Sequence, residues 1–170
     1  MSHQDSSCQY QVKKPYPPIQ VDGPNLTYAN EMLSDIGEVV SEMSDVARYF
    51  YIAVMAKEHY EEIATCFHYI SIVEMHHLNI FAQLALKLGA DPRLWSGAVY
   101  KKWWSPSYIG YSFDLRSMIA ESIQAEENAI HKYSLQADMI DDQNIVAILR
   151  RIILDEEQHL RIFKELYQSL

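Results

Sequence analysis

The chain has 170 residues and is 49% hydrophobic, which suits one compact domain with a single substantial core. A formal net charge of −9 argues against nucleic acid or an anionic membrane surface as a partner, because both would repel the chain. The segment from Met1 to Tyr10 lacks the apolar core of a signal peptide, and the longest apolar run, Tyr49 to Ala56, is too short to span a bilayer. We therefore expect a cytoplasmic protein.

The N-terminal segment is rich in proline, since four of the six prolines precede residue 25. Proline fixes its own φ and lacks a backbone donor, so this density disfavours both helix and sheet. We predict an extended arm over residues 1–27 and a folded body over residues 28–170.

The folded body begins with two long amphipathic helices that contain few interruptions. The first is expected from about Tyr28 to Ala56 and the second from about His59 to Leu88, with a tight turn between them. Gly89 and Pro92, directly after the second helix, are typical of a helix end.

A long irregular stretch over residues 90–112, rich in tryptophan and tyrosine, follows these helices. We expect its rings to pin it across the helices or against a second subunit, because a long connection must bury something to stay ordered. A third helix is expected over residues 113–140, and a fourth continues to the C-terminus from Asp141 or Asp142 as N-cap. Two helical hairpins joined by one long crossover are typical of a ferritin-like four-helix bundle, the all-α fold that we predict.

Two Glu-x-x-His units carry most of the chemical information: Glu74 with His77, and Glu156 with His159. Residues three apart on an α-helix share a face, so each unit aims one carboxylate and one imidazole at the same point. Both units lie on the apolar stripes of their helices and should therefore face the core. A buried glutamate is costly unless it is paired or neutralised.

An internal repeat adds one glutamate to each unit. Glu42 stands seven residues before Tyr49, and Glu126 stands seven residues before Tyr133. The two tyrosines could deliver protons or donate hydrogen bonds to ligands, although large core residues are equally typical of such positions. The two halves together give six candidate metal ligands: Glu42, Glu74, His77, Glu126, Glu156 and His159.

The composition of this ligand set points to a particular kind of metal centre. Four carboxylates in one core would repel one another, whereas two divalent cations would cancel their charge. Carboxylate and imidazole ligands without thiolate suit iron or manganese, while zinc usually takes fewer ligands in a closed geometry. We predict two iron ions or two manganese ions bridged by carboxylates. Two such ions can bind peroxide or dioxygen and supply the two electrons that break its O–O bond.

Other side chains compete with this set. Glu38 lies one turn before Glu42, but the repeat and the spacing to the tyrosine favour Glu42. His76 points about a quarter-turn away from the ligand face and fits a surface or interface. The roles of His68 and His131 stay open: His131 could approach the site, although an ordinary, partly buried histidine is more typical of its position. We expect the remaining glutamates of the helices to be solvated: Glu31, Glu61, Glu62, Glu121, Glu127 and Glu157.

The sequence resembles the rubrerythrin and ferritin-like dinuclear-metal superfamily over residues 28–170. The resemblance rests on the ordered set Glu42, Glu74-x-x-His77, Glu126, Glu156-x-x-His159 and on the segment 88–92 that ends the second helix. The arm from Tyr16 to Asn25 is also similar to the lead-in of manganese-catalase-like and spore-coat members.

The resemblance implies a role for each ligand. Glu74 and Glu156 would bridge the metals, Glu42 and Glu126 would be terminal ligands, and the two histidines would bind one ion each. It also implies a homodimer. Met75 occupies the position of the haem-ligating methionine of bacterioferritins, but methionine is common there in members without haem, so we predict no haem.

Two departures from typical rubrerythrins bear on the reaction. The two cysteines, Cys8 and Cys66, form no Cys-x-x-Cys pair, which argues against a rubredoxin-like electron-entry domain, a zinc ribbon or a disulfide framework. Ala129 stands where rubrerythrins carry an extra glutamate. The protein must then accept electrons from a separate donor protein, or run a cycle such as catalase-type disproportionation that needs no donor.

We therefore expect a di-metal oxidoreductase, of peroxidase or catalase type, that reduces or disproportionates hydrogen peroxide or dioxygen. One alternative is a ferritin-like iron-storage or ferroxidase protein. Another is a structural or coat protein that keeps the bundle without its chemistry, for which the proline-rich arm is the only indication in the sequence.

Overall fold

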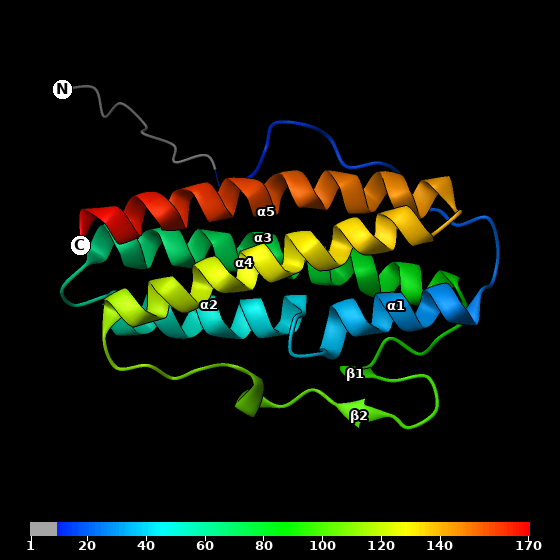
Figure 1. The fold of residues 1–170 in the computed structure, drawn as a ribbon, viewed down its shortest axis with the longest axis horizontal. Helices are drawn as coiled ribbons and strands as arrows, with labels where there is room; N and C mark the ends of the chain where they lie inside the picture. Colours follow the sequence, from blue (N-terminus) through cyan, green and yellow to red (C-terminus); the bar gives the residue numbers. More distant parts are fainter. Residues whose placement is uncertain (1–9) are drawn as a thin grey trace.

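The structure is a computed structural model that describes residues 10–170, so Cys8 and the start of the predicted arm lie outside the described residues. Long helices packed side by side form a bundle, as Figure 1 shows, and the predicted all-α fold is confirmed. The described residues form five α-helices: α1 (Leu26–Gly37), α2 (Glu42–Ala56), α3 (Glu61–Lys87), α4 (Leu115–Met139) and α5 (Gln143–Ser169).

The first predicted helix is divided in two, so the prediction of one helix over residues 28–56 was wrong. α1 ends at Gly37, and α2 begins at Glu42 after its N-cap Ser41. A Cβ on Gly37 would lie 2.9 Å from the backbone nitrogen of Trp95, so the crossover packs directly against the end of α1. The Ser41 hydroxyl donates to the Glu38 carbonyl at 2.6 Å and holds the turn. As a result, Glu42 lies in the first turn of α2.

Polar caps and one glycine set the other helix ends. The side chains of Asn25, Asp114 and Asp142 accept backbone N–H groups at the starts of α1, α4 and α5. Asp142 is one of the two N-caps proposed for the last helix. Just beyond α3, Gly89 has a φ of 99°, a conformation in which glycine avoids the steric cost of a Cβ.

The crossover between α3 and α4 holds a small antiparallel pair, β1 (Trp95–Ser96) and β2 (Lys102–Trp103), and the 3-10 turn η1 (Pro106–Tyr108). The indole Nε1 of Trp104 donates to Ser44 Oγ at 3.0 Å and ties the crossover to α2. The rings of Trp95 and Trp103 lie 5.0 Å apart. Trp104 thus holds the connection against a helix of its own chain, whereas Tyr100 and Trp103 are exposed.

Two apolar clusters fill the bundle and leave the predicted ligands between them. One cluster joins α1 to the later turns of α3 and α4 and the earlier turns of α5, with Phe81, Leu84 and Leu149 among its buried members. The other joins α2 to the earlier turns of α3 and α4 and the later turns of α5, with Phe67 and Phe163 stacked at 4.6 Å. Polar ligands at this boundary are therefore enclosed by apolar packing at both ends.

Residues 10–25 form an extended segment that passes along α5 before α1 begins, as the blue trace in Figure 1 shows. The Arg151 guanidinium of α5 donates to the backbone carbonyls of Val12 and Lys14, at 2.8 and 2.7 Å. The backbone N–H of Asp22 donates to Asp142 at the start of α5. The segment is therefore fastened to α5 at both ends.

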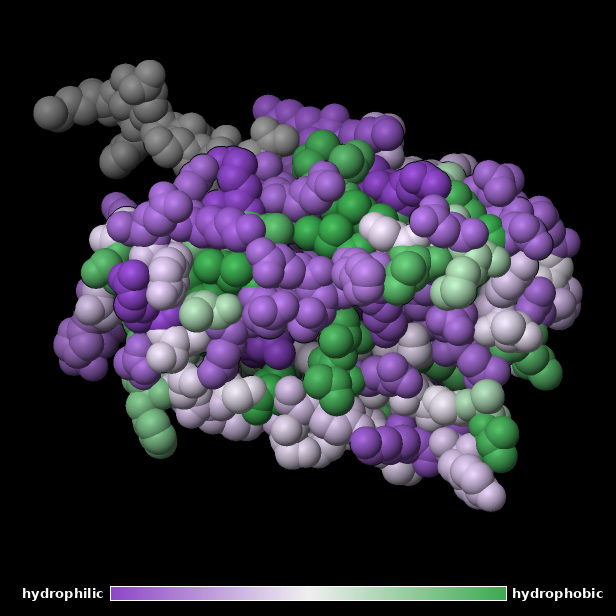
Figure 2. Space-filling view, in the orientation of Figure 1, coloured by the Kyte–Doolittle hydropathy of each residue, from purple (hydrophilic) through white to green (hydrophobic). Residues whose placement is uncertain are grey.

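Hydrophilic residues cover much of the face seen in Figure 2, and hydrophobic residues appear there in smaller groups. None of the helices within residues 10–170 combines the length and the apolar character that a membrane span requires.

Candidate metal centre

The six predicted ligands meet inside the bundle. Each of them is at most 1% exposed. They form two overlapping groups, in each of which one potential ligand atom per residue lies within 4.8 Å of the others. Glu74 and Glu156 belong to both groups, whereas Glu42 and His77 belong to the first group alone and Glu126 and His159 to the second alone.

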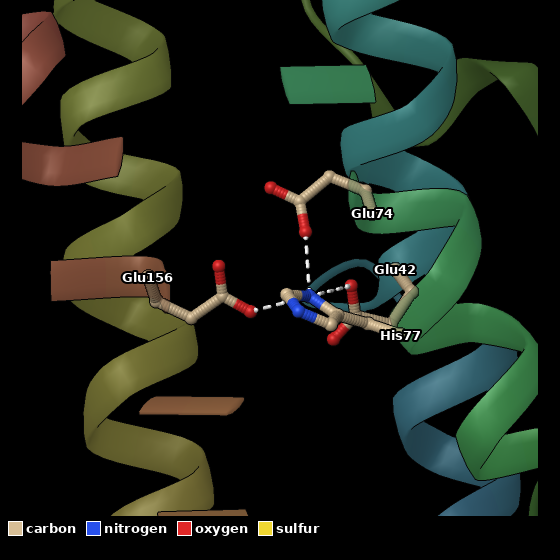
Figure 3. A group of neighbouring side chains, drawn as sticks. All are labelled: Glu42, Glu74, His77 and Glu156. Atoms are coloured by element: carbon tan, nitrogen blue, oxygen red, sulfur yellow. Dashed lines mark hydrogen bonds and ion pairs between the residues drawn. The ribbon is translucent and has the colours of Figure 1, made fainter. Parts of the chain in front are cut away.

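Figure 3 shows the first group, in which three carboxylates surround one nitrogen of His77. His77 Nδ1 lies 2.9 Å from Glu74 Oε2, 3.1 Å from Glu156 Oε1 and 3.7 Å from Glu42 Oε2. Adjacent ligand atoms of an octahedral ion with bonds of about 2.1 Å lie about 3 Å apart. The spacing of these atoms therefore suits a single metal ion.

The second group repeats this arrangement around His159. Its Nδ1 lies 2.9 Å from Glu74 Oε1, 3.0 Å from Glu156 Oε2 and 3.6 Å from Glu126 Oε1. Glu74 and Glu156 each turn one oxygen toward each histidine. This is the arrangement that a carboxylate needs to join two ions.

The pKa values of the carboxyl groups reflect their enclosure. Burial, followed by the nearby charge of Glu156, raises the pKa of Glu42 well above its usual value. Burial and the charge of Glu74 do the same to Glu126. Burial also acts to raise the pKa of Glu74, but the two histidines outweigh it and lower that pKa to about 2. Without cations, the site thus keeps some of its carboxyl groups protonated.

The pKa values of the two histidines reflect the same excess of negative charge. Burial acts to lower the pKa of both imidazoles, but the carboxylates raise the pKa of His77 and His159 well above the usual value. Even two protonated imidazoles would leave four ionised carboxylates with two uncompensated charges in a dry core. Two divalent cations would balance the four carboxylates and leave the imidazoles neutral, so the donor set fits a dinuclear centre.

Both predicted tyrosines contact a ligand from the opposite half of the chain. The Tyr49 hydroxyl donates to Glu126 Oε1 at 2.6 Å, and the Tyr133 hydroxyl donates to Glu42 Oε1 at 2.5 Å. Burial and the adjacent carboxylate raise the pKa of each hydroxyl well above its usual value. The phenols therefore stay protonated and hold the two carboxylates in place.

Behind His77 lies a polar cluster that the sequence analysis missed. His77 Nε2 lies 3.2 Å from Asp155 Oδ2 and 3.0 Å from the Tyr16 hydroxyl, which itself donates to Asp155 at 2.5 Å. Arg151 Nη1 lies 2.8 Å from the same carboxylate. Burial acts to raise the pKa of Asp155, but these hydrogen bonds hold it well below its usual value. Its spacing from Ile152, on the inward stripe of α5, was the available signal.

His159 has a different partner on its outer side. Its Nε2 donates to the backbone carbonyl of Tyr10 at 2.8 Å. A carbonyl can only accept, so Nε2 carries a proton, and Nδ1, which faces the carboxylates, is the nitrogen that would bind a metal after losing its own proton. Segment 10–16 therefore covers the outer nitrogens of both His77 and His159.

The competing residues lie elsewhere. Glu38 is exposed at the end of α1, and the structure brings Glu42 to the site instead. His68, His76 and His131 are exposed, so the expectation of a partly buried His131 was wrong. His76 packs edge-on against Tyr16 with ring centroids 4.8 Å apart. Four of the glutamates expected to be solvated are exposed: Glu61, Glu62, Glu127 and Glu157. The other two, Glu31 and Glu121, are partly buried.

Comparison with known proteins agrees with this architecture. The fold is similar to two structures of KatB, a manganese catalase from Anabaena, one described as wild type and one from Anabaena PCC7120. Each has a TM-score of 0.83 and 19% identity, covering 94% of this chain and 79% of that chain. A dodecameric thioferritin, the bacterioferritin-related protein of Bacteroides fragilis, has a TM-score of 0.63 and 19% identity, covering 86% of this chain and 87% of that chain.

These likenesses confirm the ferritin-like bundle, and at this identity they concern the fold alone. A search of curated proteins gave no match. The rubrerythrin family model matches residues 39–167, which include all six clustered carboxylate and imidazole residues. Because this match covers most of the sequence, the chain belongs to the rubrerythrin family.

Proposed function

We propose that this protein consumes hydrogen peroxide at a dinuclear iron or manganese centre. The observation that carries the proposal is the doubled ligand group, in which Glu74 and Glu156 each offer one oxygen to the His77 side and one to the His159 side. Glu42 and Glu126 complete the two sides as terminal ligands.

The donor set supports iron or manganese. Carboxylate oxygens and imidazole nitrogens suit these ions, and carboxylate-bridged pairs of them occur in helical bundles of this type. When bound, two such ions supply the two electrons exchanged when the O–O bond of peroxide breaks. KatB, which shares this fold, is a manganese catalase.

The surrounding side chains would keep the ligands in register for that chemistry. Tyr49 and Tyr133 hold one oxygen of each terminal carboxylate and retain their protons, because their pKa values are raised. Asp155 and the Tyr10 carbonyl hold the outer nitrogens of the histidines, which orients the rings. Apolar clusters pack on both ends of the ligand set.

We expect the reaction to be disproportionation. One peroxide molecule is oxidised to dioxygen and a second is reduced to water, so electrons balance without a donor. The peroxidase form would need a separate electron-donor protein, and adding a reductant tests for it.

The experiment begins with protein loaded with iron or with manganese. Diffraction data on both sides of each absorption edge should show two ions per chain, near His77 and His159. Dioxygen release and peroxide loss are then followed with and without a reductant. Release of dioxygen without reductant supports disproportionation, and peroxide loss only with reductant supports a peroxidase.

Two outcomes would overturn the proposal. A protein that holds both ions but consumes no peroxide under either condition is not this enzyme. A large shell that accumulates iron, in place of the small oligomer such as a homodimer that we expect, would favour storage. The matched control is Glu157→Ala, which alters an exposed glutamate beside Glu156 and should leave metal content and turnover unchanged.

A further inference from the structure

A small cavity lies between α2 and α4 beside the candidate metal centre. Its volume is about 200 Å³. Since a water molecule occupies about 30 Å³ of liquid volume, the cavity has room for a molecule the size of hydrogen peroxide with some water. It is lined by the turn between α1 and α2, by α4 with its acidic Glu121, by Gly110 of the crossover and by two charged residues of α2, Asp45 and Arg48.

Two residues that line this cavity are close to ligands along their helices, and these residues define what we call its inner end. Asp45 follows Glu42 by three residues and precedes Tyr49 by four, so all three share the inward face of α2. On the facing wall, Ala125 directly precedes Glu126 and presents only a methyl group. The cavity therefore reaches residues adjacent to both terminal carboxylates.

An ion pair stands at this inner end. Asp45 is 5% exposed and pairs with Nη1 of Arg48, whose side chain is 11% exposed. Arg48 Nε is buried and has no hydrogen-bond partner among the described residues. One guanidinium donor of a residue that lines the cavity is thus left without a partner.

The charges of the site reach this ion pair. Burial, together with Glu74 and Glu156, raises the pKa of Asp45 to about 7 although Arg48 acts to lower it. Burial acts to lower the pKa of Arg48, but Asp45, Tyr49 and Glu126 raise it. Asp45 and Arg48 are therefore close enough to the centre for electrostatic interaction.

The opposite side of the site is covered. The Tyr10 carbonyl and the Tyr16 hydroxyl occupy the outer nitrogens of His159 and His77, and Arg151 fastens that segment to α5. The lining of the cavity between α2 and α4 includes no residue of this segment.

We propose that this cavity is the entrance to the metal centre and that the Asp45–Arg48 pair is its gate, which limits the size of the molecule admitted. The nature of the admitted substrate, hydrogen peroxide, rests on the function proposed above. Arg48 is a specificity-determining residue in this view, because its side chain lines the cavity and interacts electrostatically with Glu126.

The test uses metal-loaded protein and two monoanions of different size, azide and benzoate. Their association is followed through the absorption of the metal centre rather than through turnover. Because the two anions carry the same charge, the ratio of their association rates reports on size and not on electrostatic attraction. In the wild type we expect azide to bind and benzoate to be largely excluded.

Two variants should move this selectivity in opposite ways. Arg48→Ala opens the gate, and we expect the benzoate-to-azide rate ratio to rise about tenfold, which corresponds to about 1.4 kcal/mol of barrier. Ala125→Met narrows the cavity without touching the ion pair, and we expect azide association to slow about tenfold. Arg150→Ala is the control, since it removes an exposed arginine of α5 and should leave both rates unchanged.

The outcomes separate this inference from the proposed function. An unchanged ratio in Arg48→Ala with an unchanged azide rate in Ala125→Met would overturn the gate, even if peroxide is consumed. The expected shifts in a wild type that consumes no peroxide would support the gate and overturn the function. If Arg48→Ala fails to fold, the azide rate of Ala125→Met decides alone, and failure to bind either metal would overturn both proposals.

Discussion

The two histidines of the candidate metal centre have equivalent contacts at their inner nitrogen, Nδ1, and different contacts at their outer nitrogen, Nε2. On the inner side the two halves of the chain are nearly equivalent: each histidine Nδ1 lies within 3.1 Å of both shared glutamates. On the outer side they differ, because His77 faces Asp155 and Tyr16 while His159 faces the Tyr10 carbonyl. The repeated halves thus build a symmetric ligand set, and the N-terminal segment makes its two ends unequal.

The largest effect on metal binding should come from removing a glutamate that both ligand groups share. Because Glu74 belongs to both groups, Glu74→Ala should lose both ions, whereas Glu42→Ala should weaken only the ion at His77. Elemental analysis of metals per chain measures this difference. Equal losses in the two variants would contradict the bridging role of Glu74, and Glu157→Ala serves as the exposed control.

Protons should compete with both ions. The raised pKa values of His77 and His159 mean that metal binding displaces a proton from each ring at neutral pH. Because each ion displaces at least the proton of its own imidazole, the apparent affinity for each ion should rise at least about tenfold per pH unit while the pH stays below the folded pKa of the histidines. Titration of the metal-free protein with manganese at several pH values measures this slope, and a flat dependence would contradict it.

The stability of the metal-free protein should change in the opposite direction. The folded pKa lies above the unfolded value for four ligands: His77, His159, Glu42 and Glu126. Protonation of these groups therefore stabilises the folded protein. This stabilisation is complete below the unfolded pKa, which is 6.5 for histidine and 4.5 for glutamate, and it is lost as pH rises through the folded pKa. Glu74 acts oppositely, since its stabilisation is lost as pH falls toward 2. The gap in Tm between metal-loaded and metal-free protein should therefore widen with pH above 6.5.

The different partners of the two Nε2 atoms predict that a change at Asp155 will affect the affinities for the two metal ions unequally. Asp155→Asn removes the charge behind His77, and a change of this kind typically lowers metal affinity about 10- to 100-fold. We expect this loss at the His77 side alone, because His159 relies on a backbone carbonyl. Competition with a chromophoric chelator should then resolve two binding steps whose affinities differ more than in the wild type. Equal weakening of both ions would contradict the inequality of the two outer nitrogens.

The smallest effects should come from the paired tyrosines. Tyr49→Phe and Tyr133→Phe each remove one buried hydrogen bond to a terminal carboxylate. Each should lower the free energy of unfolding by about 0.5–1.5 kcal/mol, and the two losses should be similar because the inner halves are equivalent. Denaturant titration measures them, and a clear inequality would show that the symmetry is limited to the ligands.

Much of the fold followed from local pattern. The apolar stripes and the residues at helix ends predicted three of the long helices to within a few residues, because helix periodicity and capping act over one or two turns. The break between α1 and α2 was missed, although Gly37 followed by Ser41 resembles a helix end and a new N-cap. The helical apolar pattern continues across this break and favoured one long helix. The packing of Trp95 against Gly37 joins residues far apart in the chain, so the sequence did not predict it.

The site shows the same division. Glu42 and Glu126 could be found because the repeat places them at equivalent helical positions. Asp155 was missed although its spacing from Ile152 places it toward the core, because its partner Tyr16 lies 139 residues away along the chain and the sequence does not show that the two meet.

The sequence by itself determined which side chains enter the core, because the direction of a side chain on a helix depends on its own turn. The tertiary structure alone decided that Nδ1 of each histidine faces the carboxylates, which groups hold the outer nitrogens, and that Asp45 and Arg48 meet a cavity beside the ligands. Those features depend on contacts between segments far apart in the chain. Their distances are set by how the helices and the N-terminal segment pack together.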